Sequence, residues 1–338
     1  MADPVVVEVT RGGLVESRHR AAVAIVDAEG RTMFGIGDVD RPIYPRSAIK
    51  PLQALALVET GAADAFGYGA RELALAQASH GGEPGHVALA AAMLKAAGLE
   101  PSTLACGAHP PSHAPAAAAL ARASQAATAL HNNCSGKHAG FLAVASRLGL
   151  PSGGYVTAGH PVQAIVRETL AAATGAPHRP EACGTDGCSI PTYPVPLTAL
   201  ARGFARFATG VGLSDGRAAA ARRLYEAAVA EPWFLAGSGR FCSEVVAALN
   251  GAALVKTGAE GVFCGAVPSL GVGIALKCDD GAARAAECAM AAVLARLLPE
   301  QADALAAWTD RPLTNWNGIS VGGVRAVGEA LAGLGPPP

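Results

Sequence analysis

The sequence contains little charge and very little lysine. Charged residues make up 16% of its 338 residues, and the formal net charge is -1. No basic patch is present, so nothing in the charge pattern favours nucleic acid or an anionic membrane as a partner. Only five of the 26 basic residues are lysine, at positions 50, 95, 137, 256 and 277. Because arginine fills the other basic positions, each lysine is a candidate for chemistry that needs an amine able to lose its proton.

Long apolar runs are also missing. No uninterrupted apolar stretch reaches the length of about 18 residues that suggests a membrane helix. The N-terminus has no basic region followed by an apolar run, so we expect a cytoplasmic protein. Eight cysteines are diluted in a large chain of which 51% is hydrophobic. In such a chain most of them should be reduced thiols in the core.

Residues 44–61 form the stretch around which the rest is organised. Pro51 is tolerated only near the start of a helix, and Gly61 is a typical stop, so the pattern predicts a helix that begins near Ser47. This helix is apolar on nearly every side and should be buried. It carries Ser47 and Lys50, which are neighbours at this spacing. A buried lysine with a lowered pKa can act as the base that activates a serine hydroxyl.

The order of the expected elements predicts an α+β fold. Runs rich in β-formers lie near both ends, at 4–10, 14–17, 21–27, 31–37, 252–256, 262–267 and 271–276. Alanine-rich helical patterns fill the middle, and a last helix is expected at 282–298. We therefore predict an antiparallel sheet built from both termini with an inserted helical lobe. Residues 1–61 and 240–338 would form the sheet lobe, and residues 62–239 the helical lobe.

Three further motifs carry groups that can do chemistry. Lys256-Thr-Gly258 lies where a strand gives way to a turn, and with Ser47-x-x-Lys50 it resembles the signature of serine β-lactamases, penicillin-binding proteins and serine-dependent glutaminases. Ala78-Ser-His-Gly-Gly-Glu83 follows a helix; Ser79 there is either a second proton carrier or part of a plain helix end. Cysteine and histidine in His131-Asn-Asn-Cys-Ser-Gly-Lys-His138 suit zinc, although buried cysteines are more often core residues.

Together the motifs resemble the rhizobial-type (class 3) L-asparaginases, a family related in fold to the serine β-lactamases. The resemblance covers nearly the whole chain. It rests on the motifs already described and on Tyr44-Pro-Arg-Ser-Ala-Ile-Lys-Pro51, Cys183-Gly-Thr-Asp-Gly-Cys188 and Val255-Lys-Thr-Gly-Ala-Glu-Gly261. It implies a β-lactamase-like fold, a homodimer, and two serine–lysine pairs, Ser47 with Lys50 and Ser79 with Lys256.

The same resemblance implies the remaining site residues. One zinc ion per chain would be held by Cys134, Lys137 and Cys188, and would support substrate binding. The residues matching positions that line the family's pocket are Arg46, His138, Asp186 and Cys242. The leading hypothesis is therefore hydrolysis of L-asparagine to L-aspartate and ammonia through an acyl-enzyme on Ser47 or, second, on Ser79.

Other functions remain open at this stage. A β-lactamase or peptidoglycan hydrolase would share the serine and lysine motifs, but its substrates lie outside the cytoplasm. A glutaminase would differ only in the length of side chain that it accepts. A non-catalytic, metal-dependent amino-acid sensor would use the same pocket without turnover.

Overall fold

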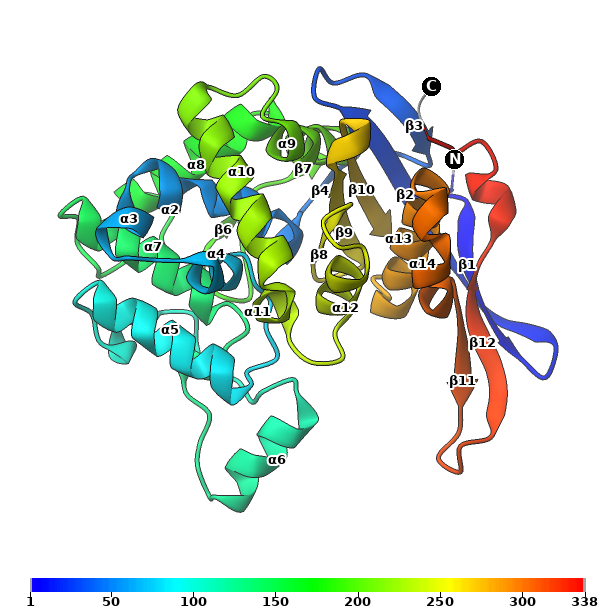
Figure 1. The fold of residues 1–338 in the computed structure, drawn as a ribbon, viewed down its shortest axis with the longest axis horizontal. Coiled ribbons are helices and arrows are strands. Elements are labelled where there is room, and N and C mark those ends of the chain that lie inside the picture. The colour runs from blue at the N-terminus through cyan, green and yellow to red at the C-terminus, as the bar shows by residue number, and fades with distance from the viewer. Residues whose placement is uncertain (1, 337–338) are drawn as a thin grey trace.

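Strands from both ends of the chain form one antiparallel sheet. The computed structural model describes residues 2–336. Its main strands are β1 (Val5–Arg11), β2 (Leu14–Asp27), β3 (Thr32–Ile36), β8 (Leu254–Thr257), β9 (Val262–Val267), β10 (Val272–Cys278), β11 (Asp310–Thr314) and β12 (Ser320–Ala326). The strand order is β11-β12-β1-β2-β10-β9-β8, with β3 also paired to β2. β8, which carries Lys256, is the edge strand, and in Figure 1 it lies on the side of the sheet nearest the helices.

Most of the helices come from the middle of the chain. They are α1 (Lys50–Gln53), α2 (Leu55–Glu59), α3 (Ala62–Ala65), α4 (Ala70–Ala76), α5 (Pro84–Ala96), α6 (Ala114–Arg122), α7 (Ser135–Arg147), α8 (Pro161–Thr174), α9 (Leu197–Thr209), α10 (Asp215–Ala230), α11 (Pro232–Ala236) and α12 (Phe241–Ala248). Two more, α13 (Ala283–Leu297) and α14 (Ala302–Thr309), follow the central strands. The predicted α+β architecture, a sheet from both termini with helices inserted, is confirmed. The proposed lobe boundaries at 61 and 240 stay predictions.

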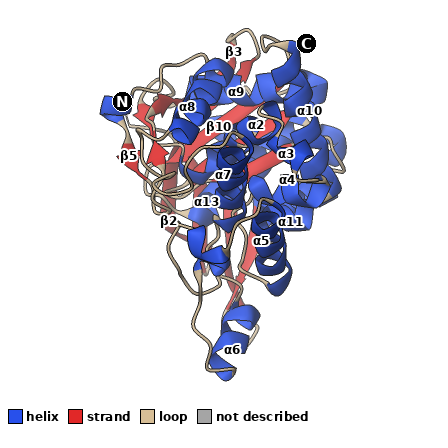
Figure 2. Ribbon diagram, turned by 90° about the vertical axis from the view of Figure 1, so that its left-hand side faces the viewer, coloured by secondary structure: helices blue, strands red, loops and turns tan. Residues whose placement is uncertain are grey.

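Helices from both parts of the chain cover the sheet. α9 packs against β10, β2 and β9, while α13 packs against β12, β1, β10 and β9. In Figure 1, α13 and α14 lie in front of the strands, and the helices α2 to α8 lie to the left of the sheet. Figure 2 shows α6 projecting from the rest of the helices. The boundary between the helices α2 to α8 and the sheet, called the seam below, therefore lies along β8.

The segment expected to be the buried helix starts and stops where the sequence predicted. A 3₁₀ turn over Arg46–Ile49 leads into α1, and Gly61 has a φ of 71°, in the left-handed region. The helix is not continuous, because α1 ends at Gln53 and α2 begins at Leu55. Every side chain of α1, including that of Lys50, is buried.

The structure differs from the prediction at several element boundaries. β2 is one continuous strand, although the sequence predicts two separate β runs, at 14–17 and 21–27. The alternation there of exposed arginines with the buried His19 follows the two faces of a strand paired to β1. α6 ends at Arg122, although the alanine-rich sequence continues to Ala129.

The hairpin formed by β11 and β12 was not predicted. Pro312 cannot donate to a strand ladder, and Gly322 and Gly323 weaken the β pattern. Both strands are nevertheless paired in register, from Asp310 opposite Arg325 to Thr314 opposite Ser320. Pro312 lies on β11, the edge strand at the opposite end of the sheet from β8, and proline is tolerated on an edge strand.

Two compositional expectations can be compared with the structure. All eight cysteines are free thiols, and all but Cys183 are buried, which confirms the expectation of reduced core cysteines. In residues 2–336, no helix combines the length and the apolar character needed to cross a bilayer.

Candidate active site

A buried serine lies between two buried lysine amines. The Lys50 Nζ donates to Ser79 Oγ at 3.0 Å, and the Lys256 Nζ donates to the same oxygen at 2.8 Å. Both lysines are 0% exposed, and Ser79 is 4% exposed. These three residues come from α1, from the loop after α4 and from β8. The structure thus brings together three of the four predicted catalytic residues.

Burial changes the protonation of both lysines. It lowers the pKa of Lys256 to about 7, and the neighbouring Lys50 contributes to the same shift. It also lowers the pKa of Lys50, although thiolate charge on Cys134 opposes this. Removing an ammonium group from water disfavours its charged form, and a second ammonium nearby adds to the effect. Each lysine is therefore more easily available as a neutral amine than a lysine in water.

Ser47, the predicted nucleophile, occupies a different position. It is half-buried in the 3₁₀ turn, and its hydroxyl makes no hydrogen bond to any other described residue. Lys50, expected to be its partner, donates instead to Ser79 and to the Ala78 carbonyl oxygen at 2.6 Å. Ser47 is thus the more accessible hydroxyl, and Ser79 is the one in contact with the amines.

The end of β8 packs directly against the turn that carries Ser47. A side chain at Gly258 would lie 2.8 Å from the Pro45 carbonyl oxygen and 3.1 Å from the Ala48 amide nitrogen. Any residue larger than glycine would therefore push β8 away from the turn. This contact explains why glycine follows Lys256 and Thr257, and it fixes the spacing between Lys256 and Ser47.

The Ser79 loop is held from two sides. The backbone amides of Ser79 and Gly81 donate to the carbonyl oxygens of Leu235 and Ala236, at 3.1 and 2.9 Å. On the other side, the His80 amide donates to Asn133 at 3.2 Å. These bonds attach the loop to the last residues of α11 and to the segment before α7, so the backbone that carries Ser79 is held in place.

Glu83 secures the same loop and was not predicted as a site residue. Its carboxylate accepts from the Ser238 amide at 2.8 Å and from the Ser238 hydroxyl at 2.9 Å. Glu83 is 7% exposed. In the sequence, the available signal was an acidic residue directly after two glycines. These two bonds tie the segment after α11 to the loop that carries Ser79.

The predicted zinc ligands form a buried cluster beside Lys50. The Lys137 Nζ donates to Cys188 Sγ at 3.0 Å, and the Lys50 Nζ donates to Cys134 Sγ at 3.1 Å. A hydrogen bond from Cys188, together with the two lysine charges, lowers the pKa of Cys134 well below its usual range and raises that of Cys188. Cys134 is therefore the more acidic of the two thiols. Although burial opposes it, negative charge on the two sulfur atoms raises the pKa of Lys137 to about 12.

This donor set suits zinc only if lysine takes part. In the described part of the chain, no three His, Cys, Asp or Glu side chains converge closely enough to hold a metal ion. Two soft sulfur ligands are present, and the Lys137 amine, which contacts Cys188 Sγ, is the third donor. The residues fit a zinc ion on the condition that Lys137 gives up its proton.

Arg46 and Asp186 form an ion pair next to this cluster. The Arg46 Nε donates to Asp186 Oδ1 at 2.5 Å. Burial raises the pKa of Asp186, but the charges of Lys137 and Arg46 outweigh it, so the pKa is lowered. Arg46 has a φ of 51°, in the left-handed region that non-glycine residues seldom adopt. Such strain immediately before Ser47 is typical of a functional segment.

The two other predicted pocket residues lie deeper. His138 is 0% exposed on α7, and its Nδ1 lies 2.6 Å from the Tyr155 hydroxyl oxygen. Cys242, on α12, is 2% exposed, and its sulfur accepts from the Thr257 amide at 3.3 Å. Burial raises the pKa of Cys242, which makes it an unreactive thiol that holds the end of β8.

Asn132, a residue without a predicted role, organises the polar segment before α7. Its side-chain nitrogen donates to the carbonyl oxygens of Cys106 and Gly107, at 2.8 and 3.0 Å. Its side-chain oxygen accepts from the Cys134 amide at 2.8 Å. The unusual polarity of residues 131–138 was the available signal, since polar groups are buried only when they have such partners.

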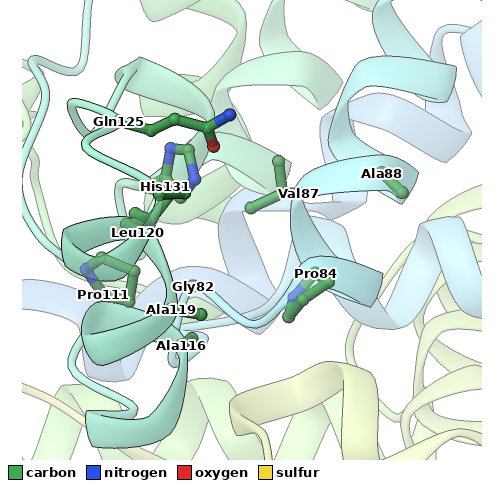
Figure 3. A pocket seen from close by; sticks show the side chains of 11 residues that line it. Gly82, Pro84, Val87, Ala88, Pro111, Ala116, Ala119, Leu120, Gln125 and His131 are labelled. Carbon is green, nitrogen blue, oxygen red and sulfur yellow. The ribbon is translucent and has the colours of Figure 1, made fainter.

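An apolar cavity of about 450 Å³ lies between α5 and α6. Figure 3 shows its lining, mostly proline, alanine, valine and leucine side chains. Gly82 and His131 contribute to it, and they belong to the two segments that hold Ser79. None of the predicted catalytic, substrate-binding or metal-binding residues lines this cavity.

Three comparisons with known proteins were made. Residues 7–326 match the family model described as L-asparaginase II. The comparison with curated proteins returned no match. Among solved structures, a β-lactamase from Mycobacterium bovis is similar, with a TM-score of 0.40 and 15% sequence identity. This similarity covers 86% of the present chain and 95% of the β-lactamase chain.

Proposed function

Because the chain belongs to the L-asparaginase II family, of amidohydrolases that act on asparagine, we propose that it hydrolyses L-asparagine through an acyl-enzyme on Ser47. The observation that carries this proposal is the hydroxyl of Ser79 between the amines of Lys50 and Lys256. Two lysines whose charged forms are destabilised supply the base that acyl transfer to a serine needs. Ser47, half-buried at the seam, is the hydroxyl that a substrate can reach.

Arg46 and Asp186 suit the zwitterionic head of an amino acid. Only the Nε of Arg46 is used in the ion pair, so its remaining N–H groups are available to a carboxylate. Asp186 keeps a low pKa and can accept from an ammonium group. An α-amino acid bound across this pair would extend its side chain toward Ser47, the residue next to Arg46.

The proton transfers can be assigned to Lys50 and Ser79, with Lys256 as the residue that positions Ser79. As the Ser47 oxygen bonds to the amide carbon, neutral Lys50 accepts the hydroxyl proton. The C–N bond breaks while Ser79 protonates the leaving nitrogen and is reprotonated by Lys50, so ammonia departs. Lys256 keeps the Ser79 hydroxyl in place. Water then attacks the ester, Lys50 accepts its proton and returns it to Ser47, and aspartate leaves.

This scheme requires Lys50 to turn toward Ser47 when substrate binds. The two residues are three apart on a helical turn, where side chains are neighbours. Catalytic hydrogen bonds are often absent in a free enzyme and form only in the substrate complex. The amide group of Ser47, at the start of the turn, would donate to the developing oxyanion because it has no partner within the turn.

Zinc is proposed as a support for substrate binding. Cys134, Lys137 and Cys188 would hold it, and its charge would favour anionic groups of the substrate and the neutral forms of the nearby lysines. None of the proton transfers above depends on it. We also propose, from the family resemblance, that the active form is a homodimer in the cytoplasm.

The function is tested by measuring ammonia release from asparagine and glutamine, with hydrolysis of a chromogenic β-lactam as a parallel assay. The proposal predicts turnover of asparagine, slower or no turnover of glutamine, and none of the β-lactam. Hydrolysis of the β-lactam in preference to asparagine would favour a β-lactamase-like enzyme. Binding of asparagine without ammonia release would favour a sensor.

Removal of zinc should raise KM more than it lowers kcat. The reason is that the ion lies beside the pocket and takes no part in activating serine. Zinc affinity should also fall as pH drops, because the ligands are then reprotonated. Metal content of protein purified without a metal-binding tag, followed by kinetics before and after chelation, measures both effects.

Cys134→Ser and Cys188→Ser serve as the matched variants for the zinc site, and both should lower zinc content. Cys288→Ser, at a buried cysteine of α13, is the control. Zinc well below one per chain in the unaltered protein would refute the site. Complete loss of kcat on chelation would instead make zinc the catalyst.

The rate should rise with pH through neutrality. The pKa of Lys256 is lowered to about 7, so this amine is charged below that pH and neutral above it. A charged Lys256 would hold Ser79 as an acceptor and place a second cation beside Lys50. We expect kcat/KM for asparagine to fall on the acid side of about pH 7. A profile that is flat between about pH 6 and about pH 8 would contradict this role of Lys256.

A further inference from the structure

His138 carries a buried ring nitrogen without a partner. The residue is 0% exposed, and its Nε2 makes no hydrogen bond within the described chain. Its other nitrogen, Nδ1, lies 2.6 Å from the Tyr155 hydroxyl oxygen. A buried polar atom without a partner is uncommon and needs an explanation, such as a ligand or water that satisfies it.

Tyr155 determines which nitrogen carries the proton. Its hydroxyl oxygen already accepts from the Ala105 amide at 2.9 Å. Tyr155 is 1% exposed, so its O–H must find an acceptor inside the protein, and His138 Nδ1 is the atom within reach. The hydroxyl therefore donates to Nδ1, and the proton of the neutral ring lies on Nε2. The unpaired atom is thus an N–H donor.

The same hydrogen bond makes the ring neutral, because Nδ1 can accept from Tyr155 only when it carries no proton. Cys134, Cys188 and a histidine would make a metal site, yet no such group of three converges among residues 2–336. His138 follows Lys137 on α7 and lies one helical turn after Cys134, so its side chain shares the helix face of the sulfur cluster.

We propose that Tyr155 is a positioning residue that fixes His138 in the Nε2–H tautomer, so that a neutral donor meets an oxygen atom of the bound substrate. This inference rests on the proposed asparaginase function. A fixed neutral donor binds a carboxylate or carbonyl oxygen without adding another positive charge between Lys50 and Lys137. Because the donor is unpaired in the free protein, its hydrogen bond is gained on substrate binding and contributes to affinity.

The test compares Tyr155→Phe with Tyr68→Phe. Tyr68 is the matched control, since it is also buried and its hydroxyl donates to a backbone carbonyl, that of Met93, at 2.6 Å. Tyr155→Phe should raise KM for asparagine about tenfold with a smaller change in kcat, as expected when one hydrogen bond to substrate is lost. Tyr68→Phe should change neither constant, although both variants lose a similar hydrogen bond in the fold.

Two further measurements separate positioning from plain packing. Histidine ¹⁵N spectra of the unaltered protein should show His138 as the Nε2–H tautomer. The His138 signal is identified because it disappears in His138→Gln. Tyr155→Phe should abolish the preference for the Nε2–H tautomer. Glutamine at 138 retains a donor near the Nε2 position without help from Tyr155. Adding Tyr155→Phe to His138→Gln should therefore raise KM no further.

The outcomes distinguish this inference from the proposed function. An Nδ1–H tautomer in the unaltered protein, or an unchanged KM in Tyr155→Phe with normal asparagine turnover, would overturn the role of Tyr155 and leave the asparaginase proposal intact. Absence of asparagine turnover in the unaltered protein would overturn the asparaginase proposal, and the role of Tyr155 that depends on it. The tautomer measurement would in that case still establish the state of His138.

Discussion

Replacing Ser47 with alanine should lower kcat for asparagine by about 10⁴- to 10⁶-fold, the loss expected when a nucleophile is removed. The fold should be unaffected, because Ser47 is half-buried and its hydroxyl makes no hydrogen bond to the described residues. The melting temperature should therefore stay within a few degrees of that of the unaltered protein, a range that corresponds to about 1 kcal/mol or less. Ammonia release and thermal unfolding of the same preparation measure both effects.

Ser79→Ala provides the comparison for Ser47→Ala. Ser79 accepts from both amines, so its loss removes one hydrogen-bond acceptor from Lys50 and one from Lys256. We expect this variant to bind asparagine and to lose activity at the step in which ammonia leaves. If Ser47→Ala retains substantial activity while Ser79→Ala has none, Ser79 is the nucleophile and the assignment made here is wrong.

Replacing Lys50 should lower kcat for asparagine by about 10³-fold or more, which is the size of the contribution that general-base catalysis makes. Lys50→Arg introduces a group that stays charged and cannot accept a proton. Lys50→Met removes the amine and keeps a side chain of similar length. Both should be nearly inactive. Activity close to that of the unaltered enzyme in Lys50→Arg would exclude Lys50 as the base.

The two Lys50 variants should differ in stability. Arginine would place an obligatory charge and extra volume in a fully buried position, which is strongly destabilising. Methionine removes the desolvation cost of the amine but leaves the Ala78 carbonyl oxygen without its donor, and these effects offset each other to within about 1 to 2 kcal/mol. Urea unfolding of Lys50→Arg and Lys50→Met, with Lys95→Met as an unrelated lysine control, measures the difference.

The fold could be predicted where local signals agreed. Pro51 and Gly61 marked the ends of a segment whose apolar residues required burial, and the structure has both limits. The hairpin of β11 and β12 escaped prediction because its pairing depends on strands distant in the chain, such as β1. Pro312 and the glycines of β12 remove the periodic pattern that would have indicated it.

The site was predictable only through motifs. No rule of spacing relates Ser79 to Lys256, which are 177 positions apart, and the motifs identified both residues without their geometry. The contact of Lys50 with Ser79 rather than Ser47 depends on where α1 meets the loop after α4, which sequence does not specify. Tyr155 acts through another residue and lies in no motif that marks chemistry. Glu83 ends the Ser79 motif, but its role depends on Ser238, which is 155 positions away.

The most direct test of the mechanism is the location of the acyl group. Enzyme mixed with asparagine is quenched in acid within the first turnovers, digested with pepsin at low pH, and mapped by mass spectrometry. The mechanism proposed here predicts an aspartyl ester on the peptide that contains Ser47, and no ester in Ser47→Ala. An aspartyl ester on the peptide that contains Ser79 in the unaltered enzyme would contradict it.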